Sequence, residues 1–177
     1  MAQKTAMRIA IVGPESCGKS TLGMALATHF QCGYVAEYAR EYFATHPHQN
    51  YSINDVIRIA QRQFQQEIEE ARQHTHLICD TSPLVCRIWS EVKFGHCPAE
   101  IEQLELATRY DGILLCAPDL PWQADPLREN PTDRNAIFER YAQRLQIGST
   151  PFRVVTGLGA QRFTCAQQQL STMGIDL

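Results

Sequence analysis

One stretch decides the fold of this chain: Gly13-Pro14-Glu15-Ser16-Cys17-Gly18-Lys19-Ser20-Thr21. It fits the pattern G-x-x-x-x-G-K-[ST] at every fixed position, which is typical of a phosphate-binding loop. Glycines let successive backbone N–H groups turn inward around phosphate oxygens, where a side chain would block the approach. The lysine reaches the β- and γ-phosphates, and the next hydroxyl can ligate Mg²⁺. We therefore expect ATP to contact Gly13 and residues 15–21, with Ser20 as a metal ligand.

The residues on either side of this loop have the pattern that such a loop requires. Residues 8–12 are mostly apolar and predict a short buried strand. Residues 21–30 predict a helix, and the apolar side chains near one face of it are Leu22, Ala25, Leu26 and Phe30. A strand, a glycine loop and a helix N-terminus together form an anion site. An ordinary glycine-rich turn would not need this context.

Length and composition indicate one α/β domain that comprises residues 1–177. The net charge is −3 and no basic block occurs, so nucleic acid is not an expected partner. The seven cysteines form no C-x-x-C pair, which favours reduced thiols and a cytoplasmic location over disulfides or a zinc site. The start of the chain lacks the apolar core of a signal peptide, and no segment predicts a membrane span.

Short apolar segments alternate with helical patterns along the chain. Strands are expected at 8–12, 33–40 (running into a charged turn), 77–80, 111–116 and 152–157. Helices are expected at 21–30, 52–74, 84–94, 98–108, 135–147 and 160–173, with a loop at 45–50. This order predicts a P-loop NTPase fold, a five-stranded parallel sheet covered by helices on both faces. The site is then expected at the carboxyl ends of the strands.

Two carboxylates follow strands and are therefore candidates for chemistry. Asp80 ends an apolar strand, where it could hold Mg²⁺ or accept a proton from an attacking hydroxyl. Glu37 ends the second strand, at the corner where a small-molecule kinase receives its acceptor. The residues alone leave open which of the two is the base. For each, the alternative is an ordinary charged residue in a turn.

The stretch 117–135 is rich in proline and charge, and we expect it to be a lid inserted after the fourth strand. Phosphoryl transfer needs positive charge against the γ-phosphate and exclusion of water, and a mobile loop with arginines supplies both. Arg128 is the favoured candidate and Arg134 the second, although a solvated loop would look similar. Gly157 is placed for the adenine edge, or is a plain turn glycine. Trp89, on an apolar helix face, is expected in the core.

Several motifs, in this order, resemble the ribosylnicotinamide kinase domain of the NadR family, within the AAA-ATPase-like P-loop group. They are the phosphate loop, Glu37-Tyr38-Ala39-Arg40-Glu41-Tyr42, Gln63, Asp80-Thr81, Ile88-Trp89-Ser90 through Phe94-Gly95, and Pro121-Trp122-x-x-Asp125-x-x-Arg128. The resemblance implies ATP-dependent phosphorylation of the 5′-hydroxyl of nicotinamide riboside. It implies that Arg128 contacts the phosphates and that the riboside lies near Glu37, Tyr38, Arg40, Gln63, Trp122 and Asp125.

The chain departs from the family pattern at two positions. Ala36 replaces a tryptophan that stacks on the nicotinamide ring, a loss on the order of 1 kcal/mol of ring binding. Ser82 stands where the family often has aspartate. NadR proteins also carry an adenylyltransferase domain and sometimes a DNA-binding one, and we expect neither here, because the chain starts at the first kinase strand.

We therefore expect a cytoplasmic kinase of a nucleoside-like small molecule, with nicotinamide riboside as the first choice. The alternatives are a kinase of another nucleoside or small alcohol, and a nucleotide-dependent regulatory ATPase. A homo-oligomer is compatible with the sequence, which does not specify the oligomeric state.

Overall fold

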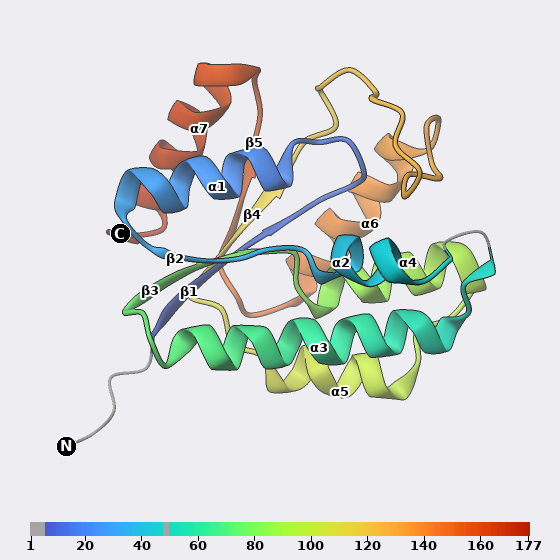
Figure 1. The fold of residues 1–177 in the computed structure, drawn as a ribbon. Coiled ribbons are helices and arrows are strands. Elements are labelled where there is room, and N and C mark those ends of the chain that lie inside the picture. Colours follow the sequence, from blue (N-terminus) through green and yellow to red (C-terminus); the bar gives the residue numbers. More distant parts are fainter. Residues whose placement is uncertain (1–5, 48–49) are drawn as a thin grey trace.

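The computed structural model describes residues 6–47 and 50–177. Its centre is one parallel sheet with the strand order β2-β3-β1-β4-β5 (Figure 1). The strands are β1 Met7–Val12, β2 Gly33–Val35, β3 His76–Asp80, β4 Gly112–Cys116 and β5 Phe152–Val155. The loop expected at 45–50 falls partly on residues 48–49, which lie outside the described residues.

Helices cover both faces of the sheet (Figure 1). They are α1 Lys19–Phe30, α2 Tyr38–Thr45, α3 Ile53–Ala71, α4 Pro83–Phe94, α5 Ala99–Ala107, α6 Arg134–Ile147 and α7 Gly159–Thr172. Ile9 and Ile11 of β1 pack with α1 and α7, whereas Ala10 and Val12 pack with α4 and α6. Alternate side chains of one strand thus enter two separate cores, as expected of a parallel sheet buried on both sides. The expected P-loop NTPase fold is confirmed.

The second strand is shorter than the sequence predicts. It ends at Val35, and the residues expected in a strand and a charged turn form helix α2 instead. The Gln63 side chain in α3 accepts a hydrogen bond from the N–H of Tyr38 at 2.8 Å and so satisfies a free donor in the first turn of α2. Ala39 and Tyr42, three residues apart, bury one side of this helix in a core shared with α3. A contact from a distant helix therefore decides the local structure.

Helix α3 also buries polar side chains. It begins as the sequence predicts, next to Ser52, and the structure shows a capping box there, in which Asp55 accepts the N–H of Ser52 at 2.7 Å. Gln63 and Glu67 are buried, at 2% and 0% exposure. Glu67 accepts the Tyr110 hydroxyl at 2.9 and 3.0 Å, which satisfies its carboxylate inside the protein.

Three smaller features complete the comparison with the sequence. In α1 the buried residues are Leu22, Gly23, Leu26 and Ala27, and Ala25 is exposed rather than near the buried face. Residues 117–133 form no helix or strand, and the last two residues of the segment expected at 117–135 belong to α6. Within the described residues, the helices are too short or too polar to pass through a bilayer.

Candidate active site

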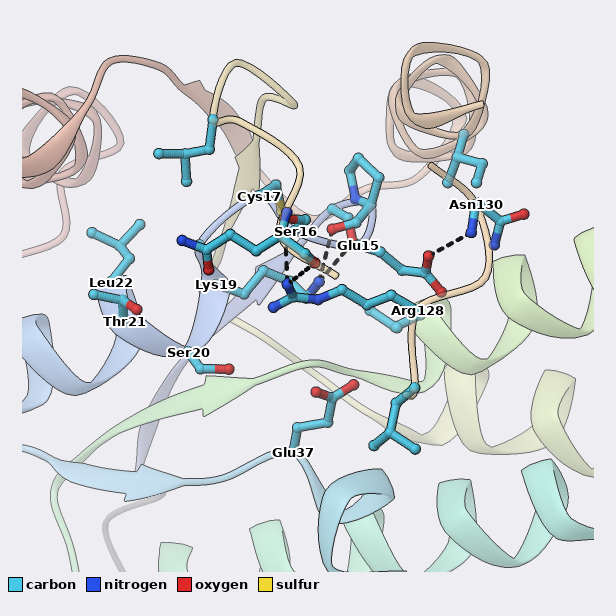
Figure 2. A pocket seen from close by; sticks show the side chains of 18 of the residues that line it. Glu15, Ser16, Cys17, Lys19, Ser20, Thr21, Leu22, Glu37, Arg128 and Asn130 are labelled. Carbon is cyan, nitrogen blue, oxygen red and sulfur yellow. Dashed lines mark hydrogen bonds between the residues drawn. The ribbon is translucent and has the colours of Figure 1, made fainter. Parts of the chain in front are cut away.

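A cavity of about 770 Å³ opens at the carboxyl ends of the strands, beside the phosphate loop (Figure 2). Such a volume is in the range of small-molecule and cofactor sites. One wall is residues 13–22, and a second is α2 and α4. The segment between β4 and α6 lies across it, and α7 lines a further side through Gly159, Arg162 and Phe163. The cavity therefore lies at the carboxyl ends of the strands, where the sequence analysis expects the site.

The phosphate loop has a backbone that its glycines make possible. Gly13 and Gly18 have φ values of +142° and +77°. A Cβ atom on Gly13 would lie 2.7 Å from the carbonyl oxygen of Cys116, so no larger residue fits against β4. Gly18 is the N-cap of α1, which has no acidic residue in its first turn. The positive end of the helix dipole is thus free to attract an anion at the cavity.

Lys19 lies within the loop, where its Nζ donates hydrogen bonds of 3.0 Å to the carbonyl oxygens of Gly13 and Pro14. Burial lowers the pKa of Lys19, but Cys17, Glu37 and Asp80 raise it, and the net pKa is above the ordinary value. The ammonium group is therefore charged at physiological pH. It lines the cavity and is placed to meet a phosphate.

Glu37 is the N-cap residue of α2 and lines the cavity opposite the loop. Its carboxylate points towards Lys19 and Arg128 (Figure 2), and the Arg40 guanidinium lies 3.7 Å from it. Burial raises its pKa, opposed by Lys19 and Arg40 and reinforced by Asp80. A carboxylate with a raised pKa is a stronger base, so Glu37 has both the position and the basicity to accept a proton.

Asp80 is more deeply placed than Glu37. It is 1% exposed, and its Oδ2 accepts the Tyr34 hydroxyl at 3.1 Å. Its other oxygen, Oδ1, is buried without a hydrogen-bond partner in the described chain. Such an atom needs a partner from outside the protein, and a hydrated Mg²⁺ ion fits that need. Thr81 follows with φ +92°, a strained value for a β-branched residue and one seen at functional sites.

The segment after β4 is docked on the phosphate loop through two side chains. Ser16 Oγ accepts the N–H of Gln123 at 2.9 Å and contacts Arg128 at 3.4 Å. Glu15 accepts the N–H groups of Glu129 and Asn130, both at 2.9 Å, as Figure 2 shows for Asn130. These hydrogen bonds are made to Glu15 and Ser16, two variable positions of the loop, and they do not involve its glycines or its lysine.

The two candidate arginines of the lid have different places. Arg128 lines the cavity beside Ser16, and its Nη1 also donates to the carbonyl oxygen of Gln123. Arg134 does not line it, and donates instead to the carbonyl oxygens of Ser16 at 3.2 Å and Leu120 at 2.9 Å. Its guanidinium also lies 5.8 Å from the centre of the Trp122 ring. Arg128 is therefore available to a phosphate, and Arg134 braces the lid against the loop.

The residues expected at the acceptor are divided in the same way. Glu37 and Arg40 line the cavity, and Arg40 is paired with Asp125 of the lid at 3.0 Å. The residues that surround the cavity without lining it are Tyr38, Gln63, Trp122 and Asp125. Gly157 is also outside the lining, and its N–H donates to Asp119 at 2.7 Å. Of these residues, Asp125 contacts the lining side chain of Arg40, and Gln63 holds the start of α2 through the N–H of Tyr38.

The lining residues that the sequence missed or assigned elsewhere include Arg162 and Trp89. Arg162 of α7 is 4% exposed and donates to the carbonyl oxygens of Cys17 and Ala117, each at 2.8 Å. Nothing in the sequence separates it from the surface arginines of other helices. Trp89 packs on the core at one edge, as expected, but it also lines the cavity. Its aromatic neighbours, Phe43 and Tyr51, are distant in the sequence and come together only in the folded chain.

The fold and this site define a P-loop protein, with a phosphate-binding loop at one end of a cavity. The chain belongs to the AAA domain family, whose pattern matches residues 8–162. It is 28% identical over 153 residues to the trifunctional NAD biosynthesis/regulator protein NadR of Salmonella typhimurium, covering 81% of this chain and 37% of that protein. The resemblance to NadR expected from the motifs is confirmed.

Solved structures show the same fold. The crystal structure of NadR in complex with NR has a TM-score of 0.76 and 20% identity, covering 98% of this chain and 53% of that chain. Deoxyadenosine kinase from M. mycoides has a TM-score of 0.64 and 15% identity, with 94% and 100% of the two chains covered. Thymidylate kinase from Ehrlichia chaffeensis has a TM-score of 0.67 and 13% identity, with 96% and 99% covered. The chain spans about half the length of the NadR structure that it matches.

Proposed function

We propose that this chain is an ATP-dependent kinase that phosphorylates the 5′-hydroxyl of nicotinamide riboside to give nicotinamide mononucleotide. One observation carries the proposal. A single cavity contains a phosphate loop with its lysine, a carboxylate across from that lysine, and a lid arginine between them. These are the parts that phosphoryl transfer to an alcohol requires. The likeness to NadR, one structure of which contains NR, supports this choice of acceptor.

ATP would bind with its phosphates on the loop and its base towards α7. The loop backbone and the N-terminus of α1 attract the phosphates, and Lys19 adds a fixed positive charge. Arg162 and Phe163 line the α7 side of the cavity, where a flat base can lie. Ser20 and Asp80 would hold Mg²⁺, because the Asp80 Oδ1 atom is buried and unpaired. When bound, the ion offsets the charge of the phosphate oxygens.

We assign the base to Glu37 rather than to Asp80. Glu37 lines the cavity and Asp80 does not, so only Glu37 can meet an acceptor hydroxyl without a rearrangement of the chain. Its carboxylate accepts the hydroxyl proton as the oxygen attacks the γ-phosphate. Lys19 and Arg128 then stabilise the negative charge that spreads over the transferring group. The lid, bonded to Glu15 and Ser16, excludes water from this step.

One observation favours a nucleoside other than nicotinamide riboside as the acceptor. Position 36 carries an exposed alanine outside the cavity lining, so the ring platform that the resemblance implies there is absent. The catalytic residues do not depend on this position, so they would serve another nucleoside equally well.

We also propose that residues 1–177 act as one kinase domain with a lid at 117–135. We place it in the cytoplasm, where its seven free thiols stay reduced.

The test is an acceptor screen with the purified chain, ATP and Mg²⁺. ADP formation and product mass are measured with nicotinamide riboside, adenosine, deoxyadenosine, cytidine, thymidine, D-ribose and no acceptor. We expect nicotinamide riboside to raise ADP formation and to gain one phosphoryl group. ADP formation that is the same with every acceptor and with none would overturn the kinase proposal in favour of a regulatory ATPase.

A further inference from the structure

The cavity has an aromatic wall that the chemistry proposed above does not use. Phe43 of α2 and Trp89 of α4 both line it. Their ring centres lie 6.2 Å apart with an angle of 61° between the planes. Aromatic side chains that pack only against a core need not face a cavity, and here two from different helices meet at one.

The wall is continuous with the two helix faces that enclose the acceptor end. Helix α4 presents Val85, Ile88, Trp89, Val92 and Lys93 to the cavity, a spacing of three and four residues that keeps them on one face. Helix α2 presents Ala39, Arg40 and Phe43 in the same way. Glu37 stands at the start of α2 and Phe43 six residues later, about 9 Å along a helix axis. The sugar of a nucleoside, with its reacting hydroxyl at Glu37 and its attached ring at Phe43, would span this distance.

The indole ring is held in a fixed orientation. Trp89 Nε1 donates to the Tyr51 hydroxyl at 2.8 Å, and Tyr51 donates to Glu129 of the lid at 2.7 Å. Lys93, one turn after Trp89, pairs with the other oxygen of Glu129 at 2.7 Å. Because this chain of hydrogen bonds occupies the polar atom of the indole, the part left for a ligand is its flat π surface.

We propose that Phe43 and Trp89 form the binding site for the aromatic ring of the acceptor, a flat heterocycle linked to the sugar whose hydroxyl meets Glu37. The inference rests on the proposed function and extends it. Stacked and edge-to-face rings attract one another beyond their buried area, and a positively charged ring adds a cation–π attraction. Phe43 on α2 and Trp89 on α4 thus provide the stacking surface that Ala36 cannot. A sugar alcohol without a ring gains nothing from it.

The first test compares Trp89→Leu and Phe43→Leu with a matched control, Phe94→Leu. Phe94 lies on the same helix as Trp89 and packs on Tyr51 at 6.0 Å, but it does not line the cavity. We expect both wall variants to raise KM for the acceptor about tenfold or more. We expect kcat and KM for ATP to change little, Trp89→Phe to recover most of the acceptor affinity, and Phe94→Leu to behave as the wild type. An unchanged acceptor KM in folded Trp89→Leu would overturn the proposal.

The second test does not depend on turnover. Trp89 and Trp122 are the two tryptophans of the chain, so Trp122→Phe leaves Trp89 as the single indole reporter. We expect its fluorescence to change on titration, without ATP, with nicotinamide riboside or another ring-bearing nucleoside, and not with D-ribose. No change with any of them would contradict a ring site, even if Trp89→Leu fails to fold.

The two tests also separate this inference from the proposed function. If another nucleoside alters Trp89 fluorescence and nicotinamide riboside is not phosphorylated, the ring site stands and the substrate proposal fails. If nicotinamide riboside is phosphorylated with the same KM by the wild type and by Trp89→Leu, the ring site fails and the substrate proposal stands.

Discussion

At the phosphate end of the cavity, ten consecutive residues, 13–22, form the wall, whereas at the acceptor end the lining comes from α2, α4, α6 and the lid. The first end depends on backbone conformation, with glycines at φ values that other residues avoid. The second depends on side chains such as Glu37, Trp89 and Arg128, which are far apart in the chain. A local backbone site is readable from sequence as a whole, whereas a site assembled from distant side chains is readable only at the positions that a motif or a strand end marks. Six substitutions and one pH measurement test this contrast between the two ends.

The largest effect is expected at the phosphate end. Lys19→Ala removes the charge that lies within the loop at 3.0 Å from two of its carbonyl oxygens. We expect kcat/KM to fall about 10⁴-fold, because no other lysine lines the loop end of the cavity and the transferring group loses its main partner. Circular dichroism and thermal melting should show a folded chain. Activity near the wild-type value would show that the loop is not the donor site.

The next largest effect separates the two carboxylates. Glu37→Gln should lower kcat about 10³-fold with KM for ATP nearly unchanged, because only the base is lost. Asp80→Asn, its matched variant, should instead raise the Mg²⁺ concentration needed for half-maximal rate, since its buried Oδ1 is the proposed metal contact. Steady-state kinetics over a Mg²⁺ series distinguish the two. The reverse pattern would assign the base to Asp80.

A smaller effect is expected when the two arginines of the lid are replaced in turn. Arg128→Ala should lower kcat about 10²-fold, since this side chain lines the cavity and is proposed to stabilise the transferring phosphoryl group. Arg134→Ala removes bonds to the Ser16 and Leu120 carbonyl oxygens and should lower the melting temperature more than it lowers kcat. Calorimetry and kinetics on both variants provide the comparison. Equal losses of kcat would mean that the lid acts as one unit.

The pH dependence tests the acceptor end without changing its shape. Glu37 acts as a base only when it is deprotonated, and burial holds its pKa above the ordinary value. The rate kcat/KM should therefore fall, by about tenfold per pH unit, as the pH drops through this raised pKa. The fall should start at a higher pH than for an exposed glutamate. The residual rate of Glu37→Gln should lack this limb, and its presence there would exclude Glu37 as its source.

The smallest effect is expected at the rim. Asp125→Asn breaks the 3.0 Å pair between the lid and Arg40, whose side chain is 46% exposed. Exposed ion pairs contribute about 0–1 kcal/mol, so we expect the acceptor KM to rise by about fivefold at most. The rise should shrink at high salt, where the pair is screened in the wild type as well. A loss as large as that of Arg128→Ala would show that Asp125 touches substrate.

Most of the fold follows from local patterns. Strands β1, β3, β4 and β5 lie within the predicted segments or within one residue of them, because buried parallel strands are short apolar runs between turn residues. The exception is the region after Val35. There the sequence is compatible with a strand, and the carboxamide of Gln63, 25 residues from Tyr38, favours a helix. A single sequence does not contain that contact.

The candidate site shows the same division. The loop, Glu37, Arg40 and Arg128 were predicted and line the cavity, because each follows a recognisable strand end or motif. Arg162 was missed because its role comes from four hydrogen bonds made in the folded chain, two of them to the carbonyl oxygens of Cys17 and Ala117. Arg134 was assigned to the ligand because an arginine in a lid looks the same whether it faces a phosphate or a carbonyl oxygen.

The sequence by itself determined the donor end, since residues 13–21 are neighbours in the chain and their glycines permit one backbone path around an anion. Only the tertiary structure decided the acceptor end. It buried Asp80 and left Glu37 at the cavity, and it brought Phe43 and Trp89 to one wall. The physical reason is that burial and side-chain contact depend on which elements meet, and residues 46 positions apart meet only when the whole sheet and its helices are packed.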